Sequence, residues 1–468
     1  MRRSVWRCFW LCFALVFLFS APKAFSGATA PLCFYKSFDA GDSPFTIHGA
    51  DIDGDGLVDL IVGNMTPTDN LRVFKNIGDG NFELIQTCTV DDCGALSVYT
   101  ATLNDDERAD LVVATGKDSV ALLVYDEGGG PFNNTAYYQA GPGCVSVYAS
   151  DFDLDGDQDL AISVVQTPQV SVLFNDGDER GGLFENTDVY GLSGVVARPA
   201  QVFAGDLNGD GYPDLAVGSS LDRSIALLMN KGGDDPDSGG KFYPPISLVL
   251  AGAQPKSLWI GELNNDGYND IAVSFYGTSS MCLLFNDPQN PGTFSSSAYF
   301  SLGYVPQFIT AADLDNKNGN DVLAVNEGNP IEPGDVYVFF NDGQGNFSFH
   351  KRVFLTEPTE VDPFPLGIFA ADFDGDNDPD VAAVNLSAGK ISILLNSEEI
   401  RGDVNNSGHI DIVDVVYMLN FLFNAGPPPP VPKSADVNSS GETDIVDVIF
   451  LLRYSWIEFS PSPGCLCE

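Results

Sequence analysis

The stretch Asp51-Ile52-Asp53-Gly54-Asp55-Gly56-Leu57-Val58-Asp59-Leu60-Ile61-Val62 joins an acidic loop directly to a short apolar run. Counted from its first residue, the loop has side-chain oxygens at positions 1, 3, 5 and 9 and glycine at position 6. The apolar run contains the β-branched residues that favour strands. The stretch therefore predicts a tight loop that leads straight into a buried strand, and its recurrence along the chain decides the fold.

The pattern recurs at intervals of about 50 residues, a period typical of propellers and solenoids. The seven loops begin at Asp51, Thr102, Asp151, Asp206, Glu262, Asp313 and Asp372. Each loop precedes two apolar strands, and turns such as Asn175-Asp176-Gly177 follow. These turns need a positive φ, which Asn, Asp and Gly tolerate, so we expect hairpins. Near-continuous apolar runs predict strands covered on both faces, and about four strands per repeat favour a propeller blade.

The two ends of the repeat region predict how the ring closes. Residues 32–38 resemble the strand that follows each Gly-Phe turn, whereas the last repeat stops after residues 391–395 without that strand. The N-terminal strand can therefore complete the last blade and hide two sheet edges. We expect a mainly β fold, with a seven-bladed beta-propeller over residues 31–397.

The N-terminus and the charge bound the kind of protein. Arg2, Arg3 and Arg7 precede an apolar run over residues 9–19, which predicts a secretory signal peptide over residues 1–26. The run is too short to span a bilayer, so we expect a secreted, extracellular or cell-surface protein without membrane insertion. A formal charge of -43 excludes a general nucleic-acid binder. With 44% hydrophobic residues the chain can build a core, so its clustered acid favours bound cations.

Two cysteines are close in sequence. Cys88 and Cys93 can bridge a turn in an oxidising compartment, and we expect that disulfide. The spacing of the other cysteines does not predict their pairing.

The acidic loops carry the oxygen ligands that calcium prefers, and so many carboxylates close together would repel one another without a cation. Solvated Asp-Gly turns are the alternative for one copy, but repeated copies with fixed oxygen positions favour calcium. The predicted ligands are Asp51, Asp53, Asp55 and Asp59; Asn104, Asp106 and Asp110; Asp151, Asp153, Asp155 and Asp159; Asp206, Asn208, Asp210 and Asp214; Glu262, Asn264, Asp266 and Asp270; and Asp372, Asp374, Asp376 and Asp380.

The copies of the loop differ in quality. Asn377 replaces glycine at position 6 of the last loop and tolerates positive φ. The loop that begins at Glu262 carries less charge. We expect the loops at Thr102 and Asp313 to be weak or empty, because Glu107 replaces glycine in the first and Lys317 lies among the ligands of the second.

These residues resemble the FG-GAP or VCBS repeat family, which includes the calcium-bearing propeller of integrin alpha subunits. The resemblance covers most of the chain after the predicted signal peptide. It implies a seven-bladed propeller whose ions rigidify the blade loops, and a function in adhesion or in recognition of carbohydrate or protein.

A different pair of loops follows, at residues 403–414 and 436–447, each with oxygens at positions 1, 3, 5, 9 and 12 and glycine at position 6. Each leads into an apolar helix. The pair resembles a type I dockerin, a small all-α module expected over residues 398–457, before a tail over residues 458–468. The resemblance implies calcium ligands at Asp403, Asn405, Ser407, Asp411 and Asp414 and at Asp436, Asn438, Ser440, Asp444 and Asp447.

In dockerins, positions 10 and 11 of the loops help to select the cohesin partner. Here they are Ile412 and Val413, and Ile445 and Val446, apolar where cellulosomal dockerins often carry hydroxyl residues. The identical pairs favour a pseudo-symmetric docking surface. The alternative is that they pack into the core of their own module.

Three classes of function are compatible with these features. The first is a recognition or scaffold protein, whose propeller binds a glycan or extracellular protein and whose dockerin tethers it to a cohesin-type partner. The second is a polysaccharide hydrolase or lyase that carries a dockerin, and the third is a structural surface protein. No Gly-x-Ser-x-Gly or His-Glu-x-x-His motif is present, and the acidic pairs lie in calcium loops, so we predict no catalytic residues.

Overall fold

The computed structural model describes most of residues 32–396 and parts of the segment 404–451. The loop residues not described are 105–107, 126–131, 133, 176, 178–183, 185, 233–239, 252–253, 295, 318, 330–332 and 356–363. The described C-terminal residues are 404, 412–424, 426–429, 435, 443–445, 447–449 and 451. The predicted signal peptide and the predicted tail lie outside them. In this described part, no helix is long and apolar enough to cross a membrane.

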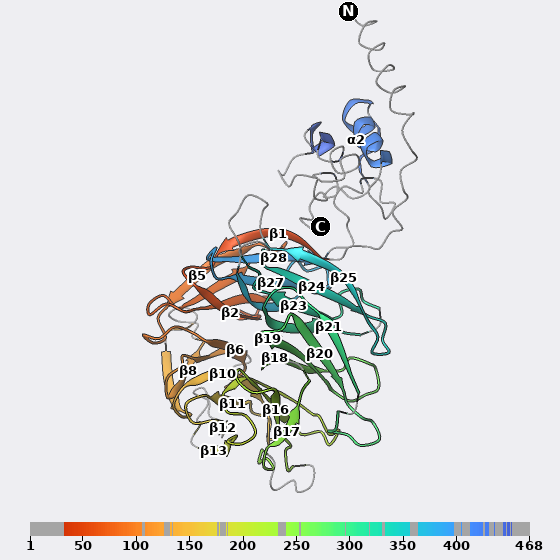
Figure 1. The fold of residues 1–468 in the computed structure, drawn as a ribbon. Coiled ribbons are helices and arrows are strands. Elements are labelled where there is room, and N and C mark those ends of the chain that lie inside the picture. Colours follow the sequence, from red (N-terminus) through yellow and green to blue (C-terminus); the bar gives the residue numbers. More distant parts are fainter. Residues whose placement is uncertain are drawn as a thin grey trace, which may run out of the picture.

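The described strands form seven four-stranded antiparallel sheets arranged in a ring (Figure 1). Blade 1 contains β2 (Pro44–Ala50), β3 (Asp59–Asn64), β4 (Leu71–Asn76) and β5 (Phe82–Cys88). Blade 2 contains β6 (Ser97–Ala101), β7 (Asp110–Ala114), β8 (Ser119–Val124) and β9 (Asn134–Gln139). Blade 3 contains β10 (Cys144–Ser150), β11 (Asp159–Val164), β12 (Gln169–Phe174) and β13 (Asn186–Gly191). Blade 4 contains β14 (Pro199–Gly205), β15 (Asp214–Ser219), β16 (Ser224–Leu228) and β17 (Ile246–Val249).

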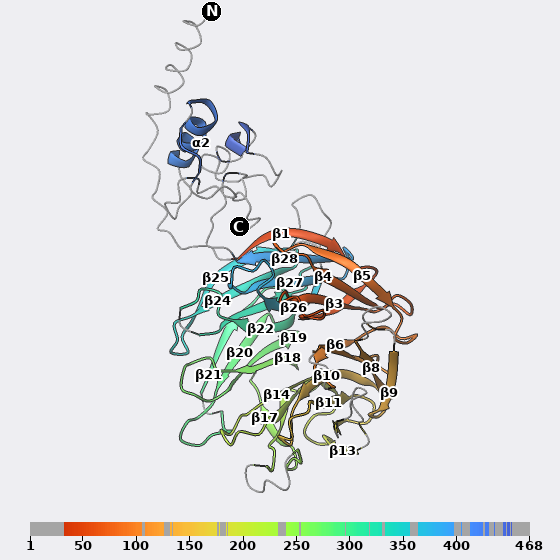
Figure 2. The same ribbon diagram turned by 180° about the vertical axis from the view of Figure 1, so that it is seen from behind.

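The remaining blades continue the order. Blade 5 contains β18 (Gln254–Gly261), β19 (Asp270–Tyr276), β20 (Ser280–Phe285) and β21 (Ser296–Ser301). Blade 6 contains β22 (Pro306–Ala312), β23 (Asp321–Asn326), β24 (Asp335–Asn341) and β25 (Phe347–Phe354). Blade 7 contains β26 (Pro365–Ala371), β27 (Asp380–Asn385), β28 (Lys390–Asn396) and the N-terminal strand β1 (Leu32–Asp39). The first strands of adjacent blades contact one another around the whole ring (Figure 2).

The ring closes as the sequence predicts. β1 pairs antiparallel with β28, from Leu32 opposite Asn396 to Asp39 opposite Lys390. Leu32 is fully buried and Phe34 nearly so, in a cluster shared with blade 6. The N-terminal strand therefore covers the edge that the last repeat would otherwise leave unpaired.

The second strand of each blade is buried on both faces, which explains its continuous apolar run. Every residue of β3, β7, β11, β15, β23 and β27 is buried, and in β19 only Tyr276 is exposed. Outer strands such as β13 and β21 alternate exposed and half-buried residues instead. Burial therefore decreases from the second strand of each blade to the fourth.

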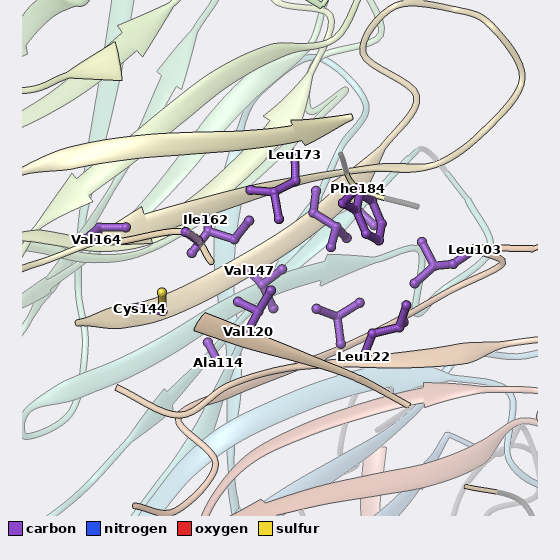
Figure 3. Packing of buried hydrophobic residues seen from close by; sticks show 14 residues of the cluster. Leu103, Ala114, Val120, Leu122, Cys144, Val147, Ile162, Val164, Leu173 and Phe184 are labelled. Carbon is purple, nitrogen blue, oxygen red and sulfur yellow. The ribbon is translucent and has the colours of Figure 1, made fainter. Parts of the chain in front are cut away.

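The hydrophobic core lies between blades. Each of the seven buried clusters among the described propeller residues combines side chains from two neighbouring blades. Figure 3 shows the cluster between blades 2 and 3, where Leu122 of β8 and Ile162 of β11 pack with Leu173 and Phe184. Each large side chain buried in this way contributes about 1.5–3 kcal/mol. A blade cannot bury these side chains alone, so the ring is the folding unit.

Aromatic rings follow one register position of the first strands. An aromatic residue occupies this position of the first strand in six blades, whereas Thr310 occupies it in blade 6. They are His48, Tyr99, Tyr148, Phe203, Trp259 and Phe369. The His48 ring lies 4.5 Å from Tyr99 and 4.9 Å from Phe369, centroid to centroid. Burial lowers the pKa of His48 to about 4, so it packs as a neutral ring.

The C-terminal segment has its own core. Helix α2 spans Ile412–Asn424, and residues 445, 447–449 and 451 are also helical. Val415 and Met418 are buried, as are Val448 and Leu451, each 33 positions further along the chain. The equivalent burial indicates that the two halves use the same side-chain positions for packing.

The expected disulfide between Cys88 and Cys93 is wrong. Both are free thiols. β5 keeps Cys88 opposite Leu71, where it packs against the core, whereas Cys93 is exposed and its thiol contacts Asp92. Burial raises the pKa of Cys88 to about 11. Cys33, in contrast, is disulfide-bonded.

Candidate metal sites

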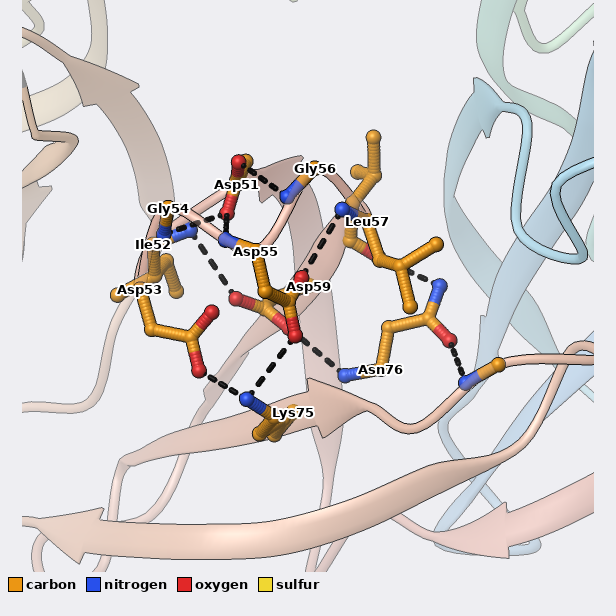
Figure 4. Close-up of polar contacts among 12 residues, drawn as sticks. Asp51, Ile52, Asp53, Gly54, Asp55, Gly56, Leu57, Asp59, Lys75 and Asn76 are labelled. Carbon is orange, nitrogen blue, oxygen red and sulfur yellow. Dashed lines mark hydrogen bonds and ion pairs between the residues drawn. The ribbon is translucent and has the colours of Figure 1, made fainter.

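The carboxylate at position 1 folds the acidic loops of blades 1, 3, 4, 5 and 7 back on themselves. In blade 1, Asp51 Oδ1 accepts the N–H groups of Gly54 at 2.8 Å and Asp55 at 3.1 Å, and its Oδ2 accepts that of Gly56 at 2.8 Å (Figure 4). The bond to the position 6 amide recurs from Asp151, Asp206, Glu262 and Asp372. One carboxylate thus holds the turn that surrounds the candidate metal position.

Position 6 takes the backbone conformation that the sequence predicts. Gly56 has φ of 88° and Gly156 has φ of 108°. Asn377, which replaces glycine in blade 7, has φ of 72°. Its N–H bonds Asp372 as glycine does in the other loops. The expectation that asparagine supports this turn is confirmed.

The aspartate at position 9 is buried and accepts two backbone hydrogen bonds. Asp59 is 1% exposed. Its Oδ2 accepts the N–H of Ile52 at 3.0 Å, and its Oδ1 accepts the N–H of Asn76 at 2.7 Å. The same two bonds recur in every other blade, at Asp110, Asp159, Asp214, Asp270, Asp321 and Asp380. We call this residue the latch aspartate; it joins the loop to the end of the third strand.

An asparagine extends this connection to the preceding blade. The Asn76 side-chain amide donates to the Val58 carbonyl at 3.1 Å and to the Phe373 carbonyl of blade 7 at 3.0 Å. Its counterparts, here called latch asparagines, are Asn175, Asn230, Asn286, Asn341 and Asn396. Blade 2 has Tyr125 instead, which donates only its backbone N–H to Asp110. Sequence reasoning assigned these asparagines only to turns, although their recurrence at one strand end was a signal.

Burial perturbs the acidity of the latch aspartates. Removal from water disfavours the charged carboxylate, and this raises the pKa of Asp59 to about 6. The same cause raises the pKa of Asp214, Asp270 and Asp321 to about 7. It raises the pKa of Asp159 and Asp380 to about 8. The backbone N–H groups act in the opposite direction but do not offset desolvation.

The structure brings positions 1, 3 and 9 of the loops together. Four carboxylate triads have one oxygen from each member within 4.8 Å of one another. They are Asp51, Asp53 and Asp59; Asp151, Asp153 and Asp159; Asp313, Asp315 and Asp321; and Asp372, Asp374 and Asp380. Blades 4 and 5 place amides, Asn208 and Asn264, at position 3. The donors are carboxylate and amide oxygens, a set that fits a hard cation such as calcium.

Position 5 carboxylates also stabilise the turn. Asp55 Oδ1 accepts the N–H of Leu57 at 3.0 Å. Equivalent bonds to the residue two positions ahead come from Asp155, Asp210, Asp266 and Asp376. In blade 2, Asp106 and Glu107 lie outside the described residues. In blade 6, Lys317 takes position 5 and its Nζ lies 3.2 Å from Asp315.

The second set of predicted ligands is partly described. Asp414 and Asp447, at position 12 of the two C-terminal loops, are fully buried. Asp447 Oδ2 accepts the N–H of Asp444 at 2.8 Å. The other predicted ligands, Asp403, Asn405, Ser407, Asp411, Asp436, Asn438 and Ser440, lie outside the described residues.

Apolar side chains near these loops face solvent. Val413 is 53% exposed and Ile445 is 46% exposed, so these two do not pack into their own module. The side chain of Ile412 and all of Val446 lie outside the described residues. Val416 and Ile449 are exposed as well and occupy equivalent positions in the two halves. Sequence reasoning missed this second pair, because it considered only positions 10 and 11 of the loops for docking.

Comparison with known proteins agrees with this geometry. The FG-GAP-like repeat family model matches residues 51–113, 102–162, 151–217 and 313–383, just over half of the chain. The chain belongs to the FG-GAP-like repeat family. The dockerin type I domain model matches residues 401–454, so the FG-GAP-like propeller is followed by a dockerin.

Two solved structures are similar to this FG-GAP-like chain. A crystal structure of BBS1N in complex with ARL6DN aligns with a TM-score of 0.53 and 14% identity, over 78% of this chain and 97% of that one. At this identity the likeness concerns the fold alone. An Agrocybe aegerita lectin, described as recognising non-reducing terminal N-acetylglucosamine, aligns with a TM-score of 0.41 and 17% identity, over 76% and 88% of the two chains.

The latch asparagine makes a prediction for stability. Asn76→Ala removes the donor from the partly buried Val58 carbonyl and from the buried Phe373 carbonyl, and we expect the free energy of unfolding to fall by about 1–3 kcal/mol. Urea denaturation measures this loss. Gln344→Ala, at an exposed turn position, is the control and should change stability by less than about 0.5 kcal/mol. Equal losses of stability from the two substitutions would show that the hydrogen bonds of the Asn76 side chain do not stabilise the fold.

The latch aspartates also predict a pH dependence in metal-free protein. Their folded pKa values exceed the unfolded value of about 3.9, so the folded state holds protons that the unfolded chain has released. Raising the pH therefore lowers stability until the folded pKa is passed. His48 and His350, whose pKa values burial lowers, act oppositely below about pH 6.5.

The window from pH 6.5 to pH 8 lies above the histidine titration, and Lys256, whose pKa burial lowers to about 8, acts oppositely only at its upper end. We expect the melting temperature of metal-free protein to fall from pH 6.5 to pH 8, followed by circular dichroism. A constant or rising melting temperature across this window would contradict the raised pKa values.

Proposed function

We propose that the chain is a secreted, calcium-binding recognition or scaffold protein. Its propeller binds a glycan or an extracellular protein, and its dockerin tethers it to a cohesin-type partner. The observation that carries the proposal is the presence, in one chain, of a dockerin type I domain and a closed ring of oxygen-lined loops. The propeller supplies a rigid recognition surface, and the dockerin supplies attachment.

Calcium has a structural role in this proposal. Residues at positions 1, 3, 5 and 9 of the blade loops would hold the ion, which would neutralise carboxylates that the fold gathers. Asp151, Asp153, Asp155 and Asp159 show the arrangement in blade 3, where no lysine or arginine side chain pairs with them among the described residues. The ion would then hold charged carboxylates beside a buried one, and would reverse the destabilisation of metal-free protein at high pH.

The outer strands of the propeller support recognition. The fourth strands β9, β21 and β25 expose Tyr137, Tyr299 and Phe349, each about half accessible to solvent. Tyr276 and Tyr304 are also exposed. Aromatic side chains offer large, rigid contact surfaces for sugar rings and for protein partners. Exposed aromatic residues on three blades fit a binding role better than a purely structural one.

The dockerin contact is placed on the paired apolar positions. Val416 and Ile449 are about half exposed and occupy equivalent positions in the two halves, and Val413 and Ile445 lie close to them in sequence. Burial of these side chains by a partner would provide the apolar core that stable protein interfaces need. We assign this exposed set to the cohesin-type partner.

A pulldown against cohesin domains encoded in the same genome tests the tether. We expect capture by at least one cohesin, and at least tenfold weaker binding by the double variant Val416→Asp and Ile449→Asp, because charge would be buried without a partner. Val189→Asp, at an exposed valine of β13, is the matched control and should bind as the unmodified chain does. Capture by no cohesin, or equal capture of the double variant, would contradict the tether.

A further inference from the structure

One lysine approaches the candidate metal position of blade 1. Lys75, on β4, places its Nζ against Asp53 and 3.0 Å from Asp55 Oδ2 (Figure 4). These carboxylates are positions 3 and 5 of the loop. The lysine side chain is 32% exposed and that of Asp53 25%, so the pair is partly shielded from water.

The ammonium group supplies what the loop otherwise requires from an ion. It is a compact positive charge with three N–H donors, and it can contact several carboxylate oxygens at once. Two neighbouring carboxylates are destabilised unless a positive charge lies close to them. Arg108 of blade 2 adds a further contact, donating to the Asp53 carbonyl at 3.1 Å. The carboxylates at positions 3 and 5 of blade 1 are therefore partly balanced by a positive charge from within the chain.

The equivalent position in every other blade is apolar. Lys75 directly precedes the latch asparagine, and the residues in its place are Val124, Phe174, Met229, Phe285, Phe340 and Leu395.

These apolar side chains reach the same region of their own loops. Gly292 lies against both Met229 and Asn208, which is position 3 of blade 4. Gly345 likewise lies against Phe285 and Asn264, position 3 of blade 5. At this position of the repeat, blade 1 therefore has a lysine where the other blades have an apolar residue. The lysine directs its ammonium group toward position 3 of the loop.

We propose that Lys75 takes the place of calcium in blade 1. A loop with the complete acidic motif then binds no ion, because the ammonium occupies the position beside its carboxylates at positions 3 and 5. This inference rests on the proposed calcium binding by the other blades. Blade 1 adjoins blade 7, where the ring closes. The Lys75 ammonium therefore stays beside the carboxylates of this junction when calcium is withdrawn.

Calcium counting on the full-length protein tests the inference. Lys75→Met installs the residue that blade 4 carries at Met229, and we expect it to bind one more calcium ion per chain than the unmodified protein. Isothermal titration of metal-free protein with calcium chloride gives the number. Lys36→Met is the matched control, because Lys36 contacts Asn81 and, among the described residues, no loop carboxylate, and it should leave the number unchanged.

A second pair of measurements keeps this test independent of the proposed calcium role. Asp153→Ala, at position 3 of blade 3, should lose one ion. If Asp153→Ala loses one ion and Lys75→Met gains none, the lysine inference is wrong and the calcium role stands. If Lys75→Met gains one ion and Asp153→Ala loses none, the lysine inference stands and the calcium role of the blade 3 loop is wrong.

Stability offers a further measurement, should the methionine variant fold poorly. Lys75→Gln keeps a similar length without the charge. We expect its melting temperature to fall in calcium-free buffer and to recover in calcium more than that of Lys36→Met does. An equal response of the two variants to calcium would overturn the inference.

Discussion

Two backbone N–H groups converge on one buried carboxylate in every blade, and the ring depends on this contact. In blade 1 the Asp59 carboxylate bonds Ile52, at the start of the loop, and Asn76, at the end of the third strand. A buried donor without a partner costs about 1–3 kcal/mol, so this carboxylate determines where loop and strands meet. The Asn76 side chain then donates a hydrogen bond to the Phe373 carbonyl and so links blade 1 to blade 7. Each such asparagine adds directed hydrogen bonds to the apolar packing between blades.

The acidity of the loops has two consequences that favour cation binding. The latch aspartate is buried, and neighbouring carboxylates at positions 1 and 3 lie within reach of the same ion. Without a cation, burial raises the pKa of the latch aspartate and ionisation destabilises the ring. In blade 1, Lys75 pairs with the carboxylates at positions 3 and 5, and the proposal assigns calcium to loops such as that of blade 3. In the dockerin the ion would instead shape a surface, because Asp414 and Asp447 are buried whereas Val416 and Ile449 are exposed.

The sequence predicts the blades and the loop positions well, because both depend on local pattern. Position 6 needs positive φ, so glycine or Asn377 marks it directly. The bond from Asn76 to Phe373 joins residues 297 positions apart, and no local pattern shows it. The sequence does not distinguish Lys75 from an ordinary surface lysine; only the position of β4 shows that it lies beside the loop. The expected disulfide failed for a similar reason, because strand pairing holds Cys88 in the sheet.

The central claim is that the latch aspartate holds buried amides at the start of the loop and at the end of the third strand. Amide hydrogen exchange, resolved by residue, tests it most directly, because exchange requires those bonds to open. We predict that the amides of Ile52 and Asn76 exchange as slowly as those of β3. Exchange as fast as that of Leu57, in the exposed turn of the same loop, would contradict the account.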